Sequence, residues 1–168
     1  MVYVDESGVK TSLQREHGRA LRGKKIEDTK RGKRSKRINV IAGLCHGKHL
    51  AVKSYGHTTK SKFFEDWFSN SLLKEVPKGC TIIMDNASFH PKSKLSKLAD
   101  EAGVNLLFLP TYSPDLNPIE ISWANMKRWL RDNLSRFCSA HFAIMDYFDL
   151  SDCMMKELFN WFTELSNF

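Results

Sequence analysis

Residues 81–86 read Thr-Ile-Ile-Met-Asp-Asn, a short and continuous apolar run that stops at a carboxylate. Such a run, without alternation of polar and apolar residues, is typical of a strand that is covered on both faces of a sheet. The segments 59–76 and 95–102, before and after it, carry apolar residues at helical spacing, and 104–109 is a further apolar strand. Strands that alternate with amphipathic helices predict an α/β domain with helices on both faces of a mixed sheet.

The rest of the chain adds three strands before this unit and one helix after it. Segment 1–4 is a short apolar strand, 38–45 is typical of a buried strand, and 50–55 alternates in part. Because only 46–48 separates the last two strands, we expect an antiparallel hairpin. Segment 119–130 has the apolar face of a third amphipathic helix.

The predicted helices carry recognisable capping residues. Thr59 is the expected N-cap of the first helix, and Gly103 stands where a left-handed residue usually ends a helix. Asn117, Pro118 and Glu120 have the spacing of a capping box at the start of the third helix. Glu120 therefore has a local structural explanation beside any chemical one.

The length and composition exclude several classes of protein. A chain of 168 residues suits one domain and is long enough to bury a core without disulfides. The longest apolar runs fall far short of the roughly 20 residues that a membrane-spanning helix needs, and we expect no membrane association. Four scattered cysteines do not form a disulfide framework, so we expect a reduced, cytoplasmic protein.

The net charge of +7 is concentrated in one segment. Residues 10–37 contain twelve Lys or Arg and three acidic residues, so the remainder of the chain is slightly acidic. This segment is also poor in large apolar residues, which predicts a long solvated arm or loop. It is either a flexible basic face without a specific partner or an element that binds a polyanion, because clustered cations release counterions from a phosphate backbone.

Three carboxylates stand at the ends or starts of predicted elements. Asp5 ends the first strand, Asp85 ends the fourth, and Glu120 lies in the first turn of the third helix. Ligands collect beyond the carboxyl ends of strands in such sheets, and converging carboxylates repel one another unless a cation neutralises them. Mg²⁺ prefers such oxygen ligands, and two ions can promote an in-line displacement at phosphorus. Asp5 and Asp85 are alternatively ordinary turn residues at strand ends.

Three sequence blocks around these carboxylates resemble those of a known family. They are 2–8 (Val-Tyr-Val-Asp-Glu-Ser-Gly), 83–90 (Ile-Met-Asp-Asn-Ala-Ser-Phe-His) and 109–120 (Leu-Pro-Thr-Tyr-Ser-Pro-Asp-Leu-Asn-Pro-Ile-Glu), followed by Trp123 and Lys127. The blocks resemble those of mariner-superfamily transposases of the DDE class, above all bacterial insertion-sequence members. The 34 residues between the second and third carboxylates match the separation in that family.

The resemblance implies a fold, a reaction and a metal. The fold is ribonuclease H-like, with a five-stranded mixed sheet of three antiparallel and two parallel strands, over a catalytic domain at 1–135 with the basic insertion at 10–37. Residues 136–168 would form a helical tail. Asp5, Asp85 and Glu120 match the catalytic, metal-binding triad, which would use Mg²⁺ or Mn²⁺, two ions in all.

The resemblance also implies partners. These are the DNA of the transposon ends, a target that is usually the easily kinked TA step, and a second copy of the chain in a synaptic complex. Asn86 and His90 would orient ligands or phosphate beside the triad. Cations of the insertion and of the third helix, where Lys127 and Arg131 share a face with Glu120, would contact DNA. The residues are Lys24, Lys25, Lys30, Arg31, Lys33, Arg34, Lys127 and Arg131.

One departure from the family concerns the beginning of the chain. Family members carry helix-turn-helix modules before the catalytic domain, whereas the first aspartate here is residue 5. The chain is then a split-frame product, a fragment or a decayed remnant, and a separate helix-turn-helix protein is an expected partner at the bacterial nucleoid. A ribonuclease H-like nuclease that only hydrolyses, or a non-catalytic DNA-binding remnant, stays open as an alternative function.

Overall fold

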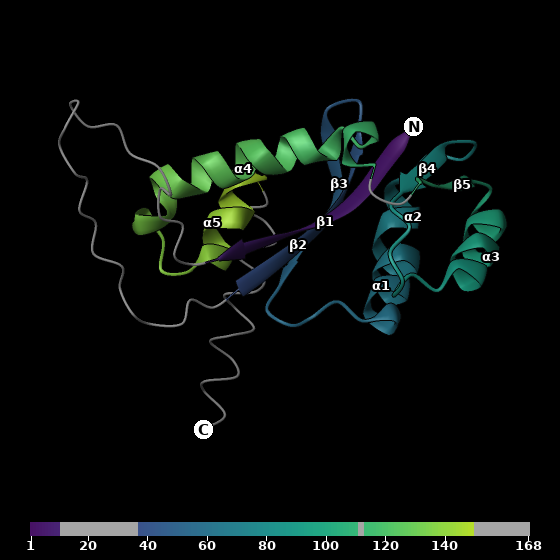
Figure 1. The fold of residues 1–168 in the computed structure, drawn as a ribbon, viewed down its shortest axis with the longest axis horizontal. Coiled ribbons are helices and arrows are strands. Elements are labelled where there is room, and N and C mark those ends of the chain that lie inside the picture. The colour runs from purple at the N-terminus through teal and green to yellow at the C-terminus, as the bar shows by residue number, and fades with distance from the viewer. Residues whose placement is uncertain (11–36, 111–112, 150–168) are drawn as a thin grey trace, which may run out of the picture.

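The computed structural model describes residues 1–10, 37–110 and 113–149. The elements follow one another along the chain as in Figure 1. The strands are β1 (Val2–Lys10), β2 (Arg37–Cys45), β3 (Lys48–Tyr55), β4 (Thr81–Met84) and β5 (Asn105–Phe108). The helices are α1 (Ser61–Trp67), the π-helix Phe68–Leu72, α2 (Leu73–Glu75), α3 (Lys92–Ala102), the 3₁₀ turn Pro114–Leu116, α4 (Ile119–Asn133), the 3₁₀ turn Leu134–Arg136 and α5 (Ala140–Tyr147).

The strands form one mixed sheet in the order β3-β2-β1-β4-β5. β1, β2 and β3 pair antiparallel, and β4 and β5 join β1 as parallel strands, which confirms the predicted fold class. The hairpin between β2 and β3 closes through His46 and Gly47, which have φ angles of 48° and 79°. Positive φ at both central residues is what the tightest hairpin turns require.

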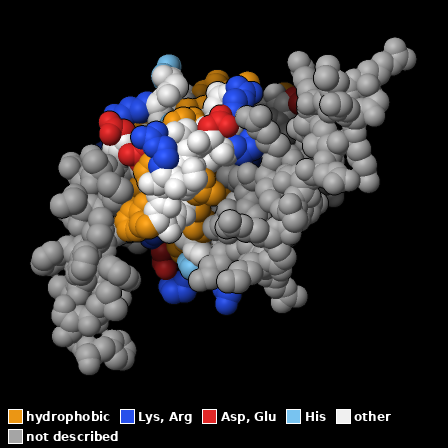
Figure 2. Space-filling view, turned by 90° about the vertical axis from the view of Figure 1, so that its left-hand side faces the viewer, with side chains coloured by type: hydrophobic (Ala, Val, Ile, Leu, Met, Phe, Trp, Pro, Cys, Tyr) orange, Lys and Arg blue, Asp and Glu red, His pale blue; other side chains and the backbone are white. Residues whose placement is uncertain are grey.

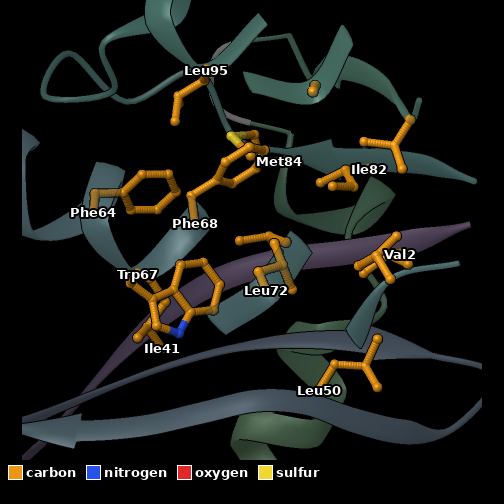
Figure 3. Packing of buried hydrophobic residues seen from close by; sticks show 14 of the residues in the cluster. Val2, Ile41, Leu50, Phe64, Trp67, Phe68, Leu72, Ile82, Met84 and Leu95 are labelled. Atoms are coloured by element: carbon orange, nitrogen blue, oxygen red, sulfur yellow. The ribbon is translucent and has the colours of Figure 1, made fainter. Parts of the chain in front are cut away.

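Two hydrophobic clusters cover the two faces of the sheet. In Figure 1, α4 and α5 lie to one side of the long strands β1 and β2, and α1, α2 and α3 lie to the other. The larger cluster joins Val2 and Val4 of β1 to the aromatic residues of α1, as Figure 3 shows for Phe64, Trp67 and their neighbours. The second cluster joins Val9 of β1 to α4 and α5.

The register of β1 and β4 decides where their polar ends lie. Val4 pairs with Met84, so the residues that follow them, Asp5 within β1 and Asp85 just beyond β4, stand at the same level of the sheet. The prediction that the first strand ends at Asp5 is wrong, because β1 continues to Lys10. Val4 belongs to the cluster on the α1 side, and because side chains alternate between the faces of a sheet, Asp5 leaves the backbone toward the α4 side.

The local capping predictions had mixed outcomes. Gly103 ends α3 in the left-handed conformation, with φ of 71°, as predicted. Thr59, however, is not the N-cap of α1: Lys60 takes that position, and the Thr59 hydroxyl donates to Glu6 instead. The capping box at α4 is also wrong, because no side chain caps that helix and the Asn117 amide bonds to β1. In both cases the side chain donates a hydrogen bond to an acceptor on β1 instead of capping the nearby helix end.

The C-terminal part of the chain is described only as far as residue 149. The helix α5 falls within the predicted helical tail, and its Ala143 and Ile144 pack in the same cluster as α4. Residues 150–168 lie outside the described residues, so the boundary at 135 stays a prediction. Among the described helices, none has the length and hydrophobicity needed to cross a membrane.

Candidate active site

The three predicted carboxylates come from β1, the end of β4 and the start of α4. Asp5 lies within β1 and is half-buried, whereas Asp85 follows β4 and is exposed. Glu120 is the second residue of α4 and is exposed. Asp5 leaves the backbone on the sheet face that α4 covers, and Asp85 stands beside it at the same level, just beyond the neighbouring strand.

Asp5 is the most strongly perturbed of these acids. Its pKa is raised to about 7, chiefly by burial and also by the charges of Glu120 and Asp85. Hydrogen bonds from the backbone of Glu6 and from the Trp123 indole oppose this rise. The Trp123 Nε1–H donates to Asp5 Oδ2 at 2.9 Å. Glu120 and Asp85 therefore both lie within electrostatic reach of Asp5.

The donor chemistry of this group fits a hard divalent cation. Carboxylate oxygens are the ligands that Mg²⁺ prefers, and a cation would relieve the repulsion that raises the pKa of Asp5. Among the described residues, no three acidic, histidine or cysteine side chains stand close enough together to hold an ion as they are. A divalent ion bound there would have to draw the carboxylate side chains closer together.

His90 lies directly against Asp85. Its Nδ1 is 3.3 Å from the Asp85 carbonyl oxygen and 3.4 Å from Asp85 Oδ1. The imidazole is buried and packs on the Phe64 ring at 4.2 Å between centroids. Burial lowers the pKa of His90, and the neighbouring Asp85 only partly opposes this, so the ring is neutral at pH 7. A neutral, packed imidazole is suited to holding the loop after β4 in place.

The second predicted neighbour, Asn86, has a buried side-chain oxygen without a hydrogen-bond partner, and so have Glu6 and Asn117. Each of the three stands next to, or three residues from, a predicted triad member. Unpartnered buried oxygens are costly in a folded protein. Their neighbours in sequence are the three predicted carboxylates, although Glu6 lies on the opposite face of β1 from Asp5.

Sequence reasoning missed Glu6 and the polar role of Trp123. Glu6 Oε2 accepts hydrogen bonds from the Thr59 hydroxyl at 2.5 Å and the Tyr55 hydroxyl at 3.1 Å, on the opposite face of β1 from Asp5. Burial raises the pKa of Glu6. Because side chains alternate between the two faces of a strand, a strand that continued past Asp5 would have placed Asp5 and Glu6 on opposite faces. Trp123 lies in the apolar face predicted for 119–130 and is buried. The spacing of apolar residues could not show which acceptor its indole N–H binds.

The predicted DNA-binding cations fall into two groups. Lys127 and Arg131 lie on α4 in the same stripe as Glu120, half-buried and exposed respectively. The six predicted cations of the basic insertion lie outside the described residues. On the face in Figure 2, the described Lys and Arg side chains are interspersed with Asp and Glu rather than forming one positive patch. This agrees with a charge excess that is concentrated in residues 10–37.

Comparisons with known proteins agree with this arrangement. The family model described as "DDE superfamily endonuclease" matches residues 1–140. None of the curated proteins compared with the chain matches it.

Several solved structures of Mos1 transposase share the fold. A pre-cleavage Mos1 transpososome has a TM-score of 0.65 at 19% identity, covering 96% of this chain and 48% of that chain. The catalytic domain of Mos1 mariner transposase has a TM-score of 0.61 at 15% identity, covering 88% and 67%. A Mos1 paired-end complex with Mn has a TM-score of 0.59 at 17% identity, covering 88% and 52%. The chain thus spans about half the length of the transposases in the two complexes.

Proposed function

This chain belongs to the DDE superfamily of endonucleases, and we propose that it is the catalytic domain of a DNA transposase. In the first step, water would attack a phosphodiester at the end of the element, breaking the bond to the 3′ oxygen and leaving a 3′-hydroxyl. In the second step, that hydroxyl would attack a phosphodiester of the target, forming one new P–O bond and releasing a 3′-hydroxyl of the target strand. A TA step, which is easily kinked, is the expected target.

The observation that carries this proposal is the placement of the carboxylates. Asp5 and Asp85 follow paired residues of adjacent parallel strands, and Glu120 opens the helix on the same face. We infer that these three residues hold Mg²⁺ or Mn²⁺, two ions in all. Bound there, such ions would activate the attacking oxygen and stabilise the leaving one. The raised pKa of Asp5 supports this, because a carboxylate that is disfavoured by burial and by neighbouring like charges is stabilised by a cation.

The remaining residues would bind and orient the substrate. Lys127 and Arg131 continue the Glu120 stripe along α4, where their cations would contact phosphates on either side of the scissile bond. The basic segment 10–37 would supply most of the salt-dependent affinity. His90 would hold Asp85, and Asn86 would orient a ligand or phosphate. Two copies of the chain would act together, with a helix-turn-helix protein recognising the transposon ends at the bacterial nucleoid.

The decisive test compares nicking of a supercoiled plasmid by the wild-type chain and by Asp85→Asn in Mg²⁺ and in Mn²⁺. We expect metal-dependent nicking by the wild type that falls at least 100-fold in the variant, while DNA binding and its salt dependence persist. Asp100→Asn, at an exposed acid of α3 outside the three sequence blocks, is the matched control and should nick normally. Equal nicking by wild type and Asp85→Asn would refute the assignment.

Two alternatives predict other results. A nuclease that only hydrolyses would nick DNA but would not join a duplex with a pre-cut 3′-hydroxyl to a second duplex. A non-catalytic remnant would bind DNA with steep salt dependence but would nick with neither metal. Strand joining, measured as a slower-migrating labelled product, therefore separates the transposase from both.

A further inference from the structure

Two side chains reach from either side of Glu120 back to β1. Asn117, three residues before Glu120, donates its amide Nδ2–H to the Val4 carbonyl at 3.4 Å. Trp123, three residues after Glu120, donates its indole N–H to Asp5 Oδ2 at 2.9 Å. The side chains of Asn117 and Trp123 thus attach the start of α4 to two consecutive residues of β1.

We propose that Trp123 is a positioning residue for the reaction, which holds the Asp5 carboxylate through Oδ2 and so fixes it relative to Glu120 for binding a divalent ion. Asn117 provides the second attachment. This inference rests on the proposed function, because it concerns the same carboxylates. It adds that the indole N–H, rather than the ring alone, determines the affinity of the site for metal.

The ring of Trp123 is held firmly enough to direct its N–H. Trp123 is 1% exposed, and its ring packs against those of Phe148 and His49 at 6.3 and 6.5 Å between centroids. His49 in turn shares a hydrogen bond of 2.5 Å with Ser122, the residue before Trp123. Packing from β3 and from the end of α5 therefore fixes the ring before any ligand arrives.

The chemistry of the indole N–H suits it to holding a metal ligand in place. An indole N–H is only a donor, so it engages one carboxylate oxygen and cannot bind metal itself. A bond from a neutral donor to a carboxylate is strengthened by the charge. Hydrogen bonds of this kind orient metal ligands, and their removal typically weakens metal affinity by about 10- to 100-fold.

The test compares Mn²⁺ binding by full-length wild type, Trp123→Phe and Trp67→Phe, measured by titration calorimetry and by the electron paramagnetic resonance of free Mn²⁺. Trp67 is a matched control, because it is also 1% exposed and its indole N–H donates to the Ala51 carbonyl at 2.7 Å, in the other core cluster. We expect Trp123→Phe to weaken Mn²⁺ binding by about 10-fold or more. Trp67→Phe should stay within about twofold of wild type despite a similar loss of a buried hydrogen bond.

The outcomes separate this inference from the proposed function. If Asp85→Asn binds Mn²⁺ as well as wild type, the metal site itself is refuted. If binding depends on Asp85 but Trp123→Phe and Trp67→Phe have equal affinity, the role of Trp123 alone is overturned. Weak binding by Trp123→Phe, with melting temperatures of the two Trp variants alike, supports it.

A second measurement covers the case in which Trp123→Phe does not fold. The wild-type chain labelled with ¹⁵N-tryptophan gives one indole signal for each of its four tryptophans. Substitution of the other three, one at a time, assigns the signal of Trp123 by elimination. We expect added Mg²⁺ to shift this signal in wild type but not in Asp85→Asn. An indole signal of Trp123 that ignores Mg²⁺ in the wild type would overturn the inference.

Discussion

Asp5 and Glu6 are adjacent acids with different surroundings. Asp5 faces α4 and accepts a hydrogen bond from the Trp123 N–H, whereas Glu6 accepts hydrogen bonds from the Tyr55 and Thr59 hydroxyls on the other face. Both have a pKa raised chiefly by burial. The charge of Asp85 raises the pKa of both acids, but that of Glu120 raises the pKa of Asp5 alone, so Asp5 is the residue whose ionisation a metal beside these acids would favour most.

The pKa of Asp5 makes the metal-free protein less stable as the pH rises. A carboxyl group whose pKa is raised from 3.8 to about 7 on folding holds its proton in the folded state but not in the unfolded state between these values. Stability is therefore lost as the pH increases through that window. We expect Asp5→Asn to remove this loss and to stabilise the protein at pH 7.5 by about 1–2 kcal/mol, discounted for solvent screening at a half-buried group.

Thermal unfolding in EDTA at pH 5 and at pH 7.5 measures this effect. The wild-type melting temperature should fall more between the two pH values than that of Asp5→Asn, and Mg²⁺ should restore the wild type alone at pH 7.5. If the melting temperatures of the two proteins changed with pH in parallel, the pKa of the Asp5 carboxyl group would not be raised by folding.

At the scale of elements, α4 combines a buried apolar face with a charged face. Its buried residues Ile119, Trp123, Met126 and Leu130 recur at helical spacing and fix the helix on the sheet. The solvent-facing stripe then carries Glu120, Lys127 and Arg131 at positions that the packed face determines. The direction in which these charges point thus depends on the same periodicity that made the helix predictable.

We expect Lys127→Ala combined with Arg131→Ala to weaken DNA binding and to lower the slope of log affinity against log salt by about two, since each phosphate contact contributes about 0.9. Lys62→Ala combined with Lys97→Ala is the matched control. These lysines are exposed on α1 and α3 and pair with Asp66 and Glu101 at 3.7 and 4.0 Å. An equal loss of slope in both double variants would indicate a general charge effect rather than a contact surface on α4.

The elements themselves were largely predictable from the sequence, whereas their polar contacts were not. The apolar run before Asp85 indicated a buried strand, the short link at 46–48 indicated a hairpin, and Gly103 indicated a helix end, because each depends on neighbours in the sequence. Asn117 was predicted to cap a helix but binds Val4, which lies 113 residues away. A capping rule considers only residues that are neighbours in the sequence. It therefore cannot include a hydrogen-bond acceptor that folding brings close from a distant segment. Apolar spacing over 59–76 indicated a helix but did not distinguish the π-helix Phe68–Leu72 within it.

At the scale of the whole molecule, the excess of positive charge and the predicted catalytic residues lie in different parts of the chain. Residues 10–37 hold an excess of nine positive charges, and the remainder of the sequence is slightly acidic. The predicted catalytic residues all lie in that remainder, on the sheet and on α4. The two parts meet where β1 ends and β2 begins, and Lys10 pairs there directly with Arg37.

This pairing allows the basic insertion to be removed without opening the sheet. Because Lys10 and Arg37 face each other in an antiparallel ladder, Asn-Gly in place of residues 11–36 can close β1 and β2 as a tight hairpin. The replacement removes ten basic and three acidic residues, which brings the net charge from +7 to zero. We expect a folded protein whose Mn²⁺ affinity stays within about twofold of wild type, since the hairpin leaves Asp5, Asp85 and Glu120 in place.

DNA binding by the shortened protein should fall by about 100-fold or more at 0.1 M salt, and most of the salt dependence should disappear. Fluorescence anisotropy with a labelled duplex at several salt concentrations measures both quantities. The residual slope should then match the contribution of Lys127 and Arg131, because these cations remain on α4. Unchanged affinity would contradict the assignment of residues 10–37 to DNA, whereas loss of Mn²⁺ binding in a folded variant would mean that the insertion also supports the carboxylate site.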